Sequence, residues 1–201
     1  MKDKIIEASI ELFNVMGTHR VTTNHIIDKL KISPGTFYYH FKNKEEIVGR
    51  IFHRITSEFD ELFVIENSEP DMEYFVSEIK KIYQLYYKYR FFYYDISMLL
   101  DRDEELAVRY RENYKLKINK IRELTLALEK RGILKKFSTD EQRECYIENQ
   151  WIINDYWMTF QKATGSPDES EVVGRGVMSY LSYLKPYLSD KAGTELEKFI
   201  A

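Results

Sequence analysis

Apolar residues along the chain recur at intervals of three and four positions, which is the spacing of one face of an α-helix. Between residues 2 and 16, Ile5, Leu12 and Met16 share one side, whereas acidic side chains occupy the other. No segment alternates with the period of two expected of a half-buried strand, and no internal repeat is found. The pattern therefore predicts an all-α protein of about nine helices.

The predicted helices begin at residue types that stabilise helix ends. Thr22 and Ser33 are N-caps for two short helices, and Pro34 suits the first helical position, where its missing N–H costs nothing. Asn43 and Glu46 have the spacing of a capping box that begins a longer helix. The expected helices cover, approximately, residues 2–16, 22–30, 34–40, 43–62, 70–89, 91–100, 103–131, 139–163 and 166–185.

Composition excludes several classes of protein. The chain has 201 residues, of which 44% are hydrophobic, and this is enough for a packed core and too much for a disordered chain. A lone cysteine, Cys145, excludes a disulfide framework and a four-cysteine zinc site. No run of 18 apolar residues is present, and acidic residues interrupt the N-terminal segment. We therefore expect a soluble cytoplasmic protein with no signal peptide and no membrane partner.

Charge is distributed unevenly along the chain. Residues 1–57 carry nine Lys and Arg against six Asp and Glu, a balance of +3, and residues 58–201 carry 21 against 27, a balance of −6. A cationic first part on an anionic body is typical of a two-part DNA-binding protein, because phosphate neutralisation dominates DNA affinity. A chance asymmetry is the alternative that charge by itself leaves open.

Residues 22–42 read as a helix-turn-helix, in which a capped helix and a short break precede a second capped helix. In this motif the second helix enters the major groove. Its exposed side carries Thr36, Tyr39 and His40, which can hydrogen-bond to phosphates and base edges. An ordinary helical hairpin is the alternative, and the polar, lysine-flanked face favours DNA binding.

This segment resembles the N-terminal domain of the TetR family of bacterial transcriptional regulators. The resemblance runs for about 45 residues without a gap and rests on Ile10-Glu11-Leu12-Phe13, Gly17, Val21-Thr22-Thr23, Ile26 and Ser33-Pro34-Gly35-Thr36-Phe37-Tyr38-Tyr39-His40-Phe41-Lys42-Asn43-Lys44-Glu45-Glu46-Ile47. It implies an all-α homodimer without cofactors. Residues 1–46 would bind DNA, and residues 47–201 would bind a ligand and dimerise.

By position in the motif, the resemblance also implies which residues contact double-stranded operator DNA. They are Thr22, Thr23, Ser33, Pro34, Gly35, Thr36, Tyr38, Tyr39, His40, Lys42 and Lys44. Two departures stand out. Leu30-Lys31 replaces the usual Ala-Gly of the turn, which costs about 1 kcal/mol if Lys31 takes a left-handed conformation. Pro34 replaces a residue that is commonly basic, which removes one direct contact.

Aromatic residues are concentrated in the second half, where the resemblance implies a small-molecule pocket. Eight of the twelve residues from 83 to 94 are aromatic, which suits a flat or hydrophobic ligand. The candidate lining residues are Tyr86, Phe92, Tyr93, Met98, Trp151, Asn154 and Trp157. The alternative is that this aromatic stripe is core or dimer interface.

The last two long helices are the predicted dimer interface, because the family pairs them into a four-helix bundle. The candidate contact residues are Trp157, Phe160, Val173, Val177, Leu181 and Leu184, and Gly174 would permit a close approach of helices. The alternative is a packing face within one chain.

Enzyme signatures are missing from the sequence: it has no Gly-Lys-Ser/Thr phosphate loop, no Gly-x-Ser-x-Gly elbow and no His-Glu-x-x-His, and its histidines lack metal spacing. We therefore predict a non-enzymatic, ligand-responsive regulator, a repressor that a small hydrophobic or aromatic effector releases from a palindromic operator. A DNA-binding architectural or protein-interaction factor that senses no small molecule is the alternative.

Overall fold

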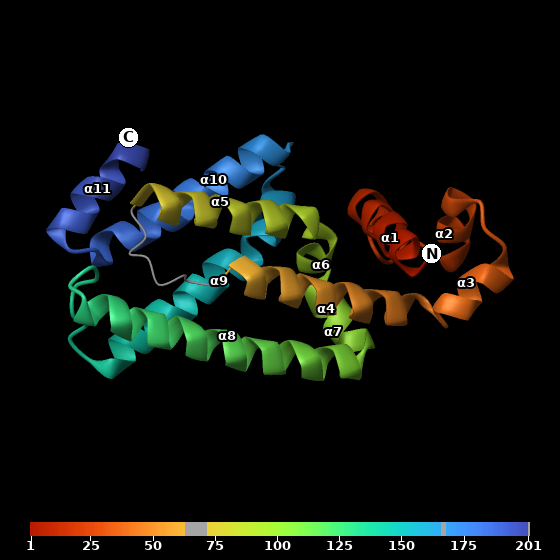
Figure 1. The fold of residues 1–201 in the computed structure, drawn as a ribbon, viewed down its shortest axis with the longest axis horizontal. Coiled ribbons are helices and arrows are strands. Elements are labelled where there is room, and N and C mark those ends of the chain that lie inside the picture. The colour runs from red at the N-terminus through yellow and green to blue at the C-terminus, as the bar shows by residue number, and fades with distance from the viewer. Residues whose placement is uncertain (63–71, 166–167, 201) are drawn as a thin grey trace. The chain divides into compact units, whose positions relative to one another are not determined.

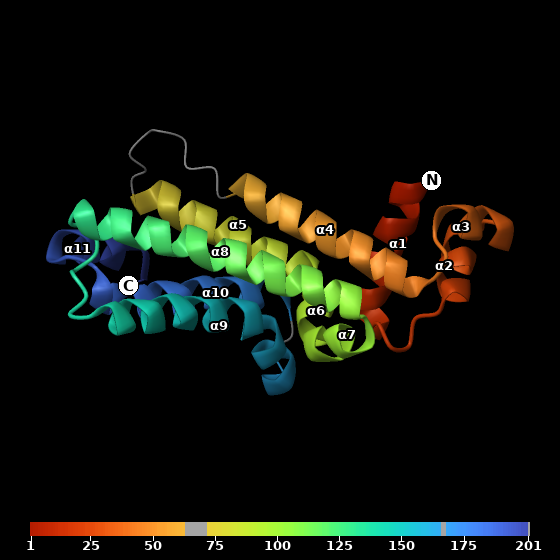
Figure 2. The same ribbon diagram turned by 90° about the horizontal axis from the view of Figure 1, so that it is seen from below.

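The computed structural model describes residues 1–62, 72–165 and 168–200, and this part of the chain is built of helices and contains no β-strand (Figures 1 and 2). It contains α1 (Lys2–Met16), α2 (Thr23–Leu30), α3 (Pro34–His40), α4 (Lys44–Leu62), α5 (Met72–Lys88), α6 (Arg90–Tyr94), α7 (Ile96–Arg102), α8 (Glu104–Lys130), α9 (Asp140–Thr164), α10 (Glu169–Leu184), the 3-10 turn η1 (Lys185–Tyr187) and α11 (Asp190–Ile200). The all-α prediction is confirmed, and the number of helices is close to that expected.

The predicted caps begin the helices as expected. The Thr22 hydroxyl accepts from the backbone N–H of His25, and His25 Nδ1 accepts from the Thr22 N–H, which completes a capping box. Ser33 caps α3 by accepting from the Thr36 N–H at 3.1 Å. Asn43 caps α4 in the same way, through the Glu46 N–H at 2.9 Å.

Two features of the second half differ from the predicted elements. The helix expected over 91–100 is two helices, α6 and α7, separated at Asp95. The Asp95 carboxylate accepts from the backbone N–H and the hydroxyl of Thr18, a contact between residues 77 positions apart. The last predicted helix ends before Pro186, whereas the structure has a further helix, α11, whose Ala192 and Leu196 are buried. The predicted start of the helix at residue 70 lies outside the described residues.

The chain divides into two compact units, and the division falls within α5 and α8. Unit 1 comprises the described residues of 1–64 together with 88–108, and unit 2 comprises those of 65–87 and 109–201. Unit 1 thus contains α4, α6 and α7 as well as the first three helices. The functional boundary expected after residue 46 remains a prediction.

An aromatic core holds unit 1 together. Phe13 of α1 contacts Phe91 of α6 with ring centroids 5.1 Å apart, and Phe52 of α4 stacks on Phe92 at 5.2 Å. All four rings are buried. Phe92, a candidate ligand residue, is therefore a core residue of this unit.

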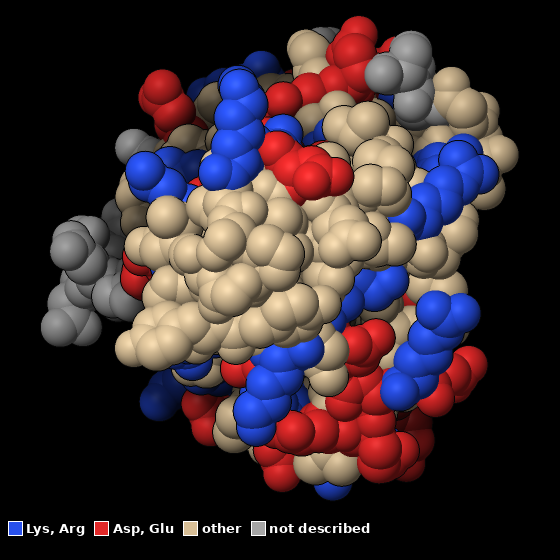
Figure 3. Space-filling view, turned by 90° about the vertical axis from the view of Figure 1, so that its right-hand side faces the viewer, with Lys and Arg blue, Asp and Glu red and all other residues tan. Residues whose placement is uncertain are grey.

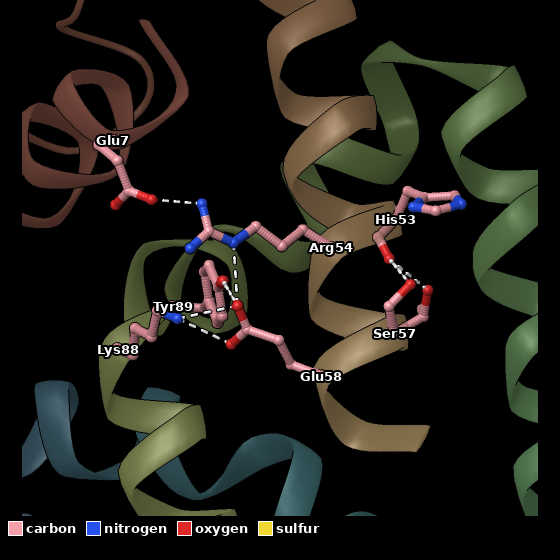
Figure 4. Close-up of polar contacts among 8 residues, drawn as sticks. Glu7, His53, Arg54, Ser57, Glu58, Lys88 and Tyr89 are labelled. Atoms are coloured by element: carbon pink, nitrogen blue, oxygen red, sulfur yellow. Dashed lines mark hydrogen bonds and ion pairs between the residues drawn. The ribbon is translucent and has the colours of Figure 1, made fainter. Parts of the chain in front are cut away.

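A polar network at the edge of this core joins α1, α4 and the end of α5 (Figure 4). Glu58 accepts hydrogen bonds from Arg54, Lys88 and Tyr89, at 2.8–2.9 Å, and Arg54 also pairs with Glu7 of α1. Burial acts to raise the pKa of Glu58, but these donors outweigh it and hold the pKa below its ordinary value. The network fixes α4 against α1 within unit 1.

The core of unit 2 depends on a glycine. α9 packs along α10, and the rings of Tyr83 and Trp157 meet edge to face with centroids 6.2 Å apart. A Cβ atom on Gly176 of α10 would lie 2.3 Å from the Tyr83 ring and 2.8 Å from Trp157 Nε1. A close approach of helices within this chain thus occurs at Gly176, and the approach expected at Gly174 between two copies remains a prediction.

Candidate nucleic-acid interface and effector region

The α2–α3 pair has a buried side and an exposed side. Ile26 and Ile27 of α2 are buried, as are Phe37 of α3 and Phe41 directly after it. These apolar contacts fix the orientation of α3, so its other side faces solvent. Tyr39 is 85% exposed on that side.

The turn between the two helices contains a strained residue. Lys31 has φ of 53° and ψ of 43°, and is the non-glycine residue with positive φ among those the structure describes. Its N–H and that of Ile32 donate to Asp28 O and Ile27 O, which is how a left-handed residue closes a helix C-terminus. Lys31 therefore adopts the left-handed conformation whose energetic cost the departure from the family pattern implied.

The predicted DNA-contacting residues gather on one part of unit 1. Seven are exposed, namely Thr22, Ser33, Pro34, Gly35, Tyr38, Tyr39 and Lys42, and four are half-buried, namely Thr23, Thr36, His40 and Lys44. The Thr23 and Tyr38 hydroxyls lie 3.3 Å apart and link α2 to α3. Ser33 Oγ lies 2.9 Å from Thr36 Oγ1. Their role in DNA contact remains a prediction.

Lys44 has an internal role in the fold. Its ammonium group donates to Thr18 O at 2.7 Å and to Val21 O at 3.1 Å, which ties the α1–α2 connection to the start of α4. An ammonium group has three donors, so one N–H is left for a phosphate oxygen. Lys44 therefore supports the motif as well as being a candidate contact.

Figure 3 views the end of the molecule at which α2 and α3 lie in Figure 1. A broad uncharged area occupies the middle of this face, Lys and Arg side chains lie around its margin, and acidic side chains lie at its upper edge and gather below it. Uncharged hydrogen-bonding groups between cations suit a duplex, since bases lie between two phosphate backbones.

The candidate effector residues are divided between the two units. Phe92 and Tyr93 are buried in unit 1, where Met98 lines a small recess together with Thr18 and Val48. Tyr86, Trp151, Asn154 and Trp157 belong to unit 2. A pocket lined by all seven remains a prediction.

Three residues of unit 2 outside the candidate set lie beside its members, namely Tyr83, Tyr110 and Asp155. Tyr83 contacts Tyr86 with ring centroids 5.9 Å apart, and its hydroxyl lies 2.9 Å from Asn154 Oδ1. Asp155 accepts a short hydrogen bond from Tyr110. Asp155 could have been predicted from the sequence, because it is a carboxylate on the side of a helix that also carries aromatic residues.

The candidate dimer residues are mostly covered within the chain itself. Trp157, Val173, Leu181 and Leu184 are buried, which leaves them little surface for a second copy, and Val177 is half-buried. Phe160 is exposed. Tyr156 and Ile152, one and two turns before it on α9, are exposed as well, as is Met178 on α10.

Known families match almost the whole chain. A family model described as bacterial regulatory proteins of the tetR family matches residues 5–51, and a second, described as a bacterial transcriptional repressor, matches residues 55–196. The chain belongs to the TetR family. Members of this family are DNA-binding regulators that act as dimers, so family membership confirms the predicted class of protein and the prediction that it is not an enzyme.

TetR-family proteins are also the relatives found by sequence. The chain is 32% identical over 91 residues to IcaR of Staphylococcus epidermidis, a negative transcriptional regulator of a biofilm operon, and 38% identical over 61 residues to the transcriptional regulator QacR of Staphylococcus aureus. These matches cover 45% and 30% of this chain, and 46% and 32% of the relatives. The chain thus spans less than half the length of the curated relatives it matches.

Similar solved structures cover the full fold. A TetR-family regulator from Marinobacter aquaeolei has a TM-score of 0.89 at 31% identity, covering 100% of this chain and 97% of that one. A transcriptional regulator from Saccharomonospora viridis, solved with choline, has a TM-score of 0.72 at 16% identity, and the match covers 94% of this chain and 97% of that one. At this identity the likeness shows the fold alone.

No helix in the described part of the chain is both long and apolar enough to span a membrane.

Proposed function

We propose that this TetR-family regulator represses transcription from a palindromic operator and that a small hydrophobic or aromatic effector releases it. The observation that carries the proposal is the exposed face of α3. Tyr39 extends into solvent from a short helix that buried Phe37 holds in place, and Lys42 follows it. Such a helix can present hydrogen-bonding groups to base edges while nearby cations bind phosphate.

A two-fold operator requires two copies of this face, and the exposed apolar stripe on α9 supports dimerisation. Ile152, Tyr156 and Phe160 recur every four residues, so they share one side of the helix. Met178 adds apolar surface on α10, which packs against α9. A second copy of the chain is the occupant we propose, since a two-fold dimer matches a palindromic site.

Genomic DNA fragments retained by the purified protein at about 0.15 M salt provide the test. We expect the sequenced fragments to share a palindrome beside a small set of genes. Retention without a common site would favour the architectural factor, because sequence-independent binding needs only phosphate contacts. Absence of retention by effector-free protein would overturn the assignment of α3 as the reading helix.

Lys42→Ala tests the face itself. Lys42 is exposed and lies directly after α3, so its loss should weaken binding to all sequences and reduce the slope of log affinity against log salt by about 0.9. Lys191→Ala removes the same charge from an exposed position on α11 and serves as the control. Titrations of labelled operator at several salt concentrations measure both slopes, and equal slopes for the two variants would contradict the proposed interface.

Effector sensing separates the proposal from its alternative. A ligand that binds the folded chain raises its melting temperature, because it stabilises the fold by an amount that grows with the logarithm of its concentration relative to Kd. We expect hydrophobic or aromatic compounds to raise the melting temperature and to release operator DNA in the same concentration range. A broad panel that changes neither quantity would favour a factor that senses no small molecule.

A further inference from the structure

Lys31, in the turn between α2 and α3, holds an unfavourable backbone conformation. Its φ of 53° lies in the left-handed region, where a Cβ atom causes strain that glycine avoids. The turn needs only the backbone of this residue, because the hydrogen bonds that close it are donated by the N–H groups of Lys31 and Ile32. A glycine would make the same turn without the strain.

The Lys31 side chain does not contribute to the fold through polar contacts. It is exposed, and its ammonium group forms no hydrogen bond or ion pair with any other residue in the ranges that the structure describes. Lys29, two positions earlier, is paired instead, with its ammonium group 2.7 Å from the Glu11 carboxylate. Backbone strain that the fold does not need occurs in proteins where the residue serves a function, so the free ammonium group of Lys31 is the feature to explain.

Lys31 lies near one end of α3, and Lys42 lies near the other. Lys31 is two positions before Ser33, the N-cap of α3, so the Cα atoms of these two residues are within about 7 Å of each other. α3 has seven residues and a length of about 10 Å, and Lys42 comes two positions after its last residue, His40. Two exposed lysines thus flank the helix that the proposed function assigns to the major groove, which is about 12 Å wide.

We propose that Lys31 binds a backbone phosphate of the operator at the N-terminal end of α3, and that this contact is why a lysine occupies a position suited to glycine. The inference rests on the proposed function, since it requires α3 to lie in the major groove. The lysine ammonium is a compact charge on a flexible stem, so it can reach a phosphate from the turn. Such a contact adds affinity for DNA of any sequence and helps to fix the register of α3.

Stability and DNA affinity should respond in opposite directions to one substitution at this position. Lys31→Gly relieves the backbone strain and so stabilises the free protein, but it also removes the phosphate contact. Lys31→Gln removes the charge and keeps the Cβ atom, so it separates the loss of the contact from the change in the backbone. Lys31→Arg keeps both the charge and the strain and should conserve the contact, since a guanidinium group also binds phosphate.

The probe is a labelled duplex of the genomic fragment that the wild-type protein retains most strongly, titrated with the full-length chain at several salt concentrations. We expect Lys31→Gln and Lys31→Gly to bind at least about fivefold more weakly than the wild type at about 0.15 M salt. The slope of log affinity against log salt should fall by about 0.9 for each phosphate contact that is lost. Lys29→Gln is the matched control, because it removes the same charge from a lysine already paired with Glu11, and its affinity should stay within about twofold of the wild type.

Uncharged phosphates locate the contact. In a series of duplexes, one phosphate of each half-site at a time is replaced by a neutral methylphosphonate, and each loss of wild-type affinity marks a contacted phosphate. Lys31→Gln should be insensitive to one replacement to which the wild type responds, and Lys42→Ala should be insensitive to a different one. These double-mutant cycles assign each lysine to its phosphate, since two changes that remove the same interaction are not additive.

Equal losses of affinity in Lys31→Gln and Lys29→Gln would overturn the inference, because they would show only a general effect of charge. A Lys31→Gly protein that binds DNA as tightly as the wild type would overturn it as well, as would a phosphate series in which Lys31→Gln responds wherever the wild type does. If Lys42→Ala lowers the affinity in the same titrations, the proposed function stands and only the role of Lys31 is rejected. Wild-type protein that binds no duplex would reject both.

Discussion

At the level of single residues, Lys31 adopts a left-handed backbone conformation that lysine disfavours. A side chain in the left-handed region is destabilised by about 1–2 kcal/mol, and glycine avoids this cost but loses more entropy on folding. We expect Lys31→Gly to stabilise the chain by about 0.5–1 kcal/mol, measured by denaturant unfolding. Lys31→Ala removes the same charge but keeps the Cβ atom, so a similar gain in both variants would show that strain is not the cause.

Asp155 gives a second residue-scale prediction, on stability. Its pKa is raised from 3.8 to about 7 by burial, so between these values the folded chain holds a proton that the unfolded chain has released. The free energy of unfolding should therefore decrease as pH rises through this window, by on the order of 4 kcal/mol, relative to Asp155→Asn. Unfolding curves of both proteins at pH 4 to 8 measure the difference, and parallel curves would contradict it.

At the scale of elements, α10 approaches its neighbours through a glycine. Gly176→Ala would place a Cβ atom against the buried ring of Tyr83 and should destabilise the chain by about 1–3 kcal/mol. Gly174→Ala, two residues earlier on the same helix, meets no atom within 4 Å in this chain and should stabilise it by up to about 1 kcal/mol through helix propensity. Thermal unfolding of the pair measures both, and equal effects would argue against a packing cause.

Comparison of the helices shows which of their boundaries could be predicted from the sequence and which could not. The caps at Thr22, Ser33 and Asn43 act within three residues, so they could be read directly from the chain. The break at Asp95 depends on Thr18, which is distant in sequence, and no local pattern encodes it. The last helix, α11, was missed because Pro186 precedes it and Gly193 lies inside it, although packing of Leu196 stabilises it.

At the scale of the whole molecule, the exposed stripe on α9 should decide the oligomeric state. Phe160→Glu places a charge in the proposed apolar interface, so the mass in solution should fall to that of one chain, 24.2 kDa. Operator affinity should fall as well, because one chain contacts one half-site. Leu116→Glu, at an exposed apolar position on α8, is the control, and light scattering that finds both variants dimeric would exclude this face.

The family, the all-α fold and the helix-turn-helix could be predicted from the amino acids alone, because they depend on periodicity, caps and a motif that is continuous in the chain. Which apolar side chains are covered and which are left exposed depends on the packing of the helices. In the packed chain, Leu181 and Leu184 are buried, whereas Ile152 and Tyr156 are exposed. Asp155 is buried beside Tyr86 of α5 and Tyr110 of α8. Helical periodicity identifies the apolar side of each helix, but burial depends on which helices meet there, and only the packed chain sets that.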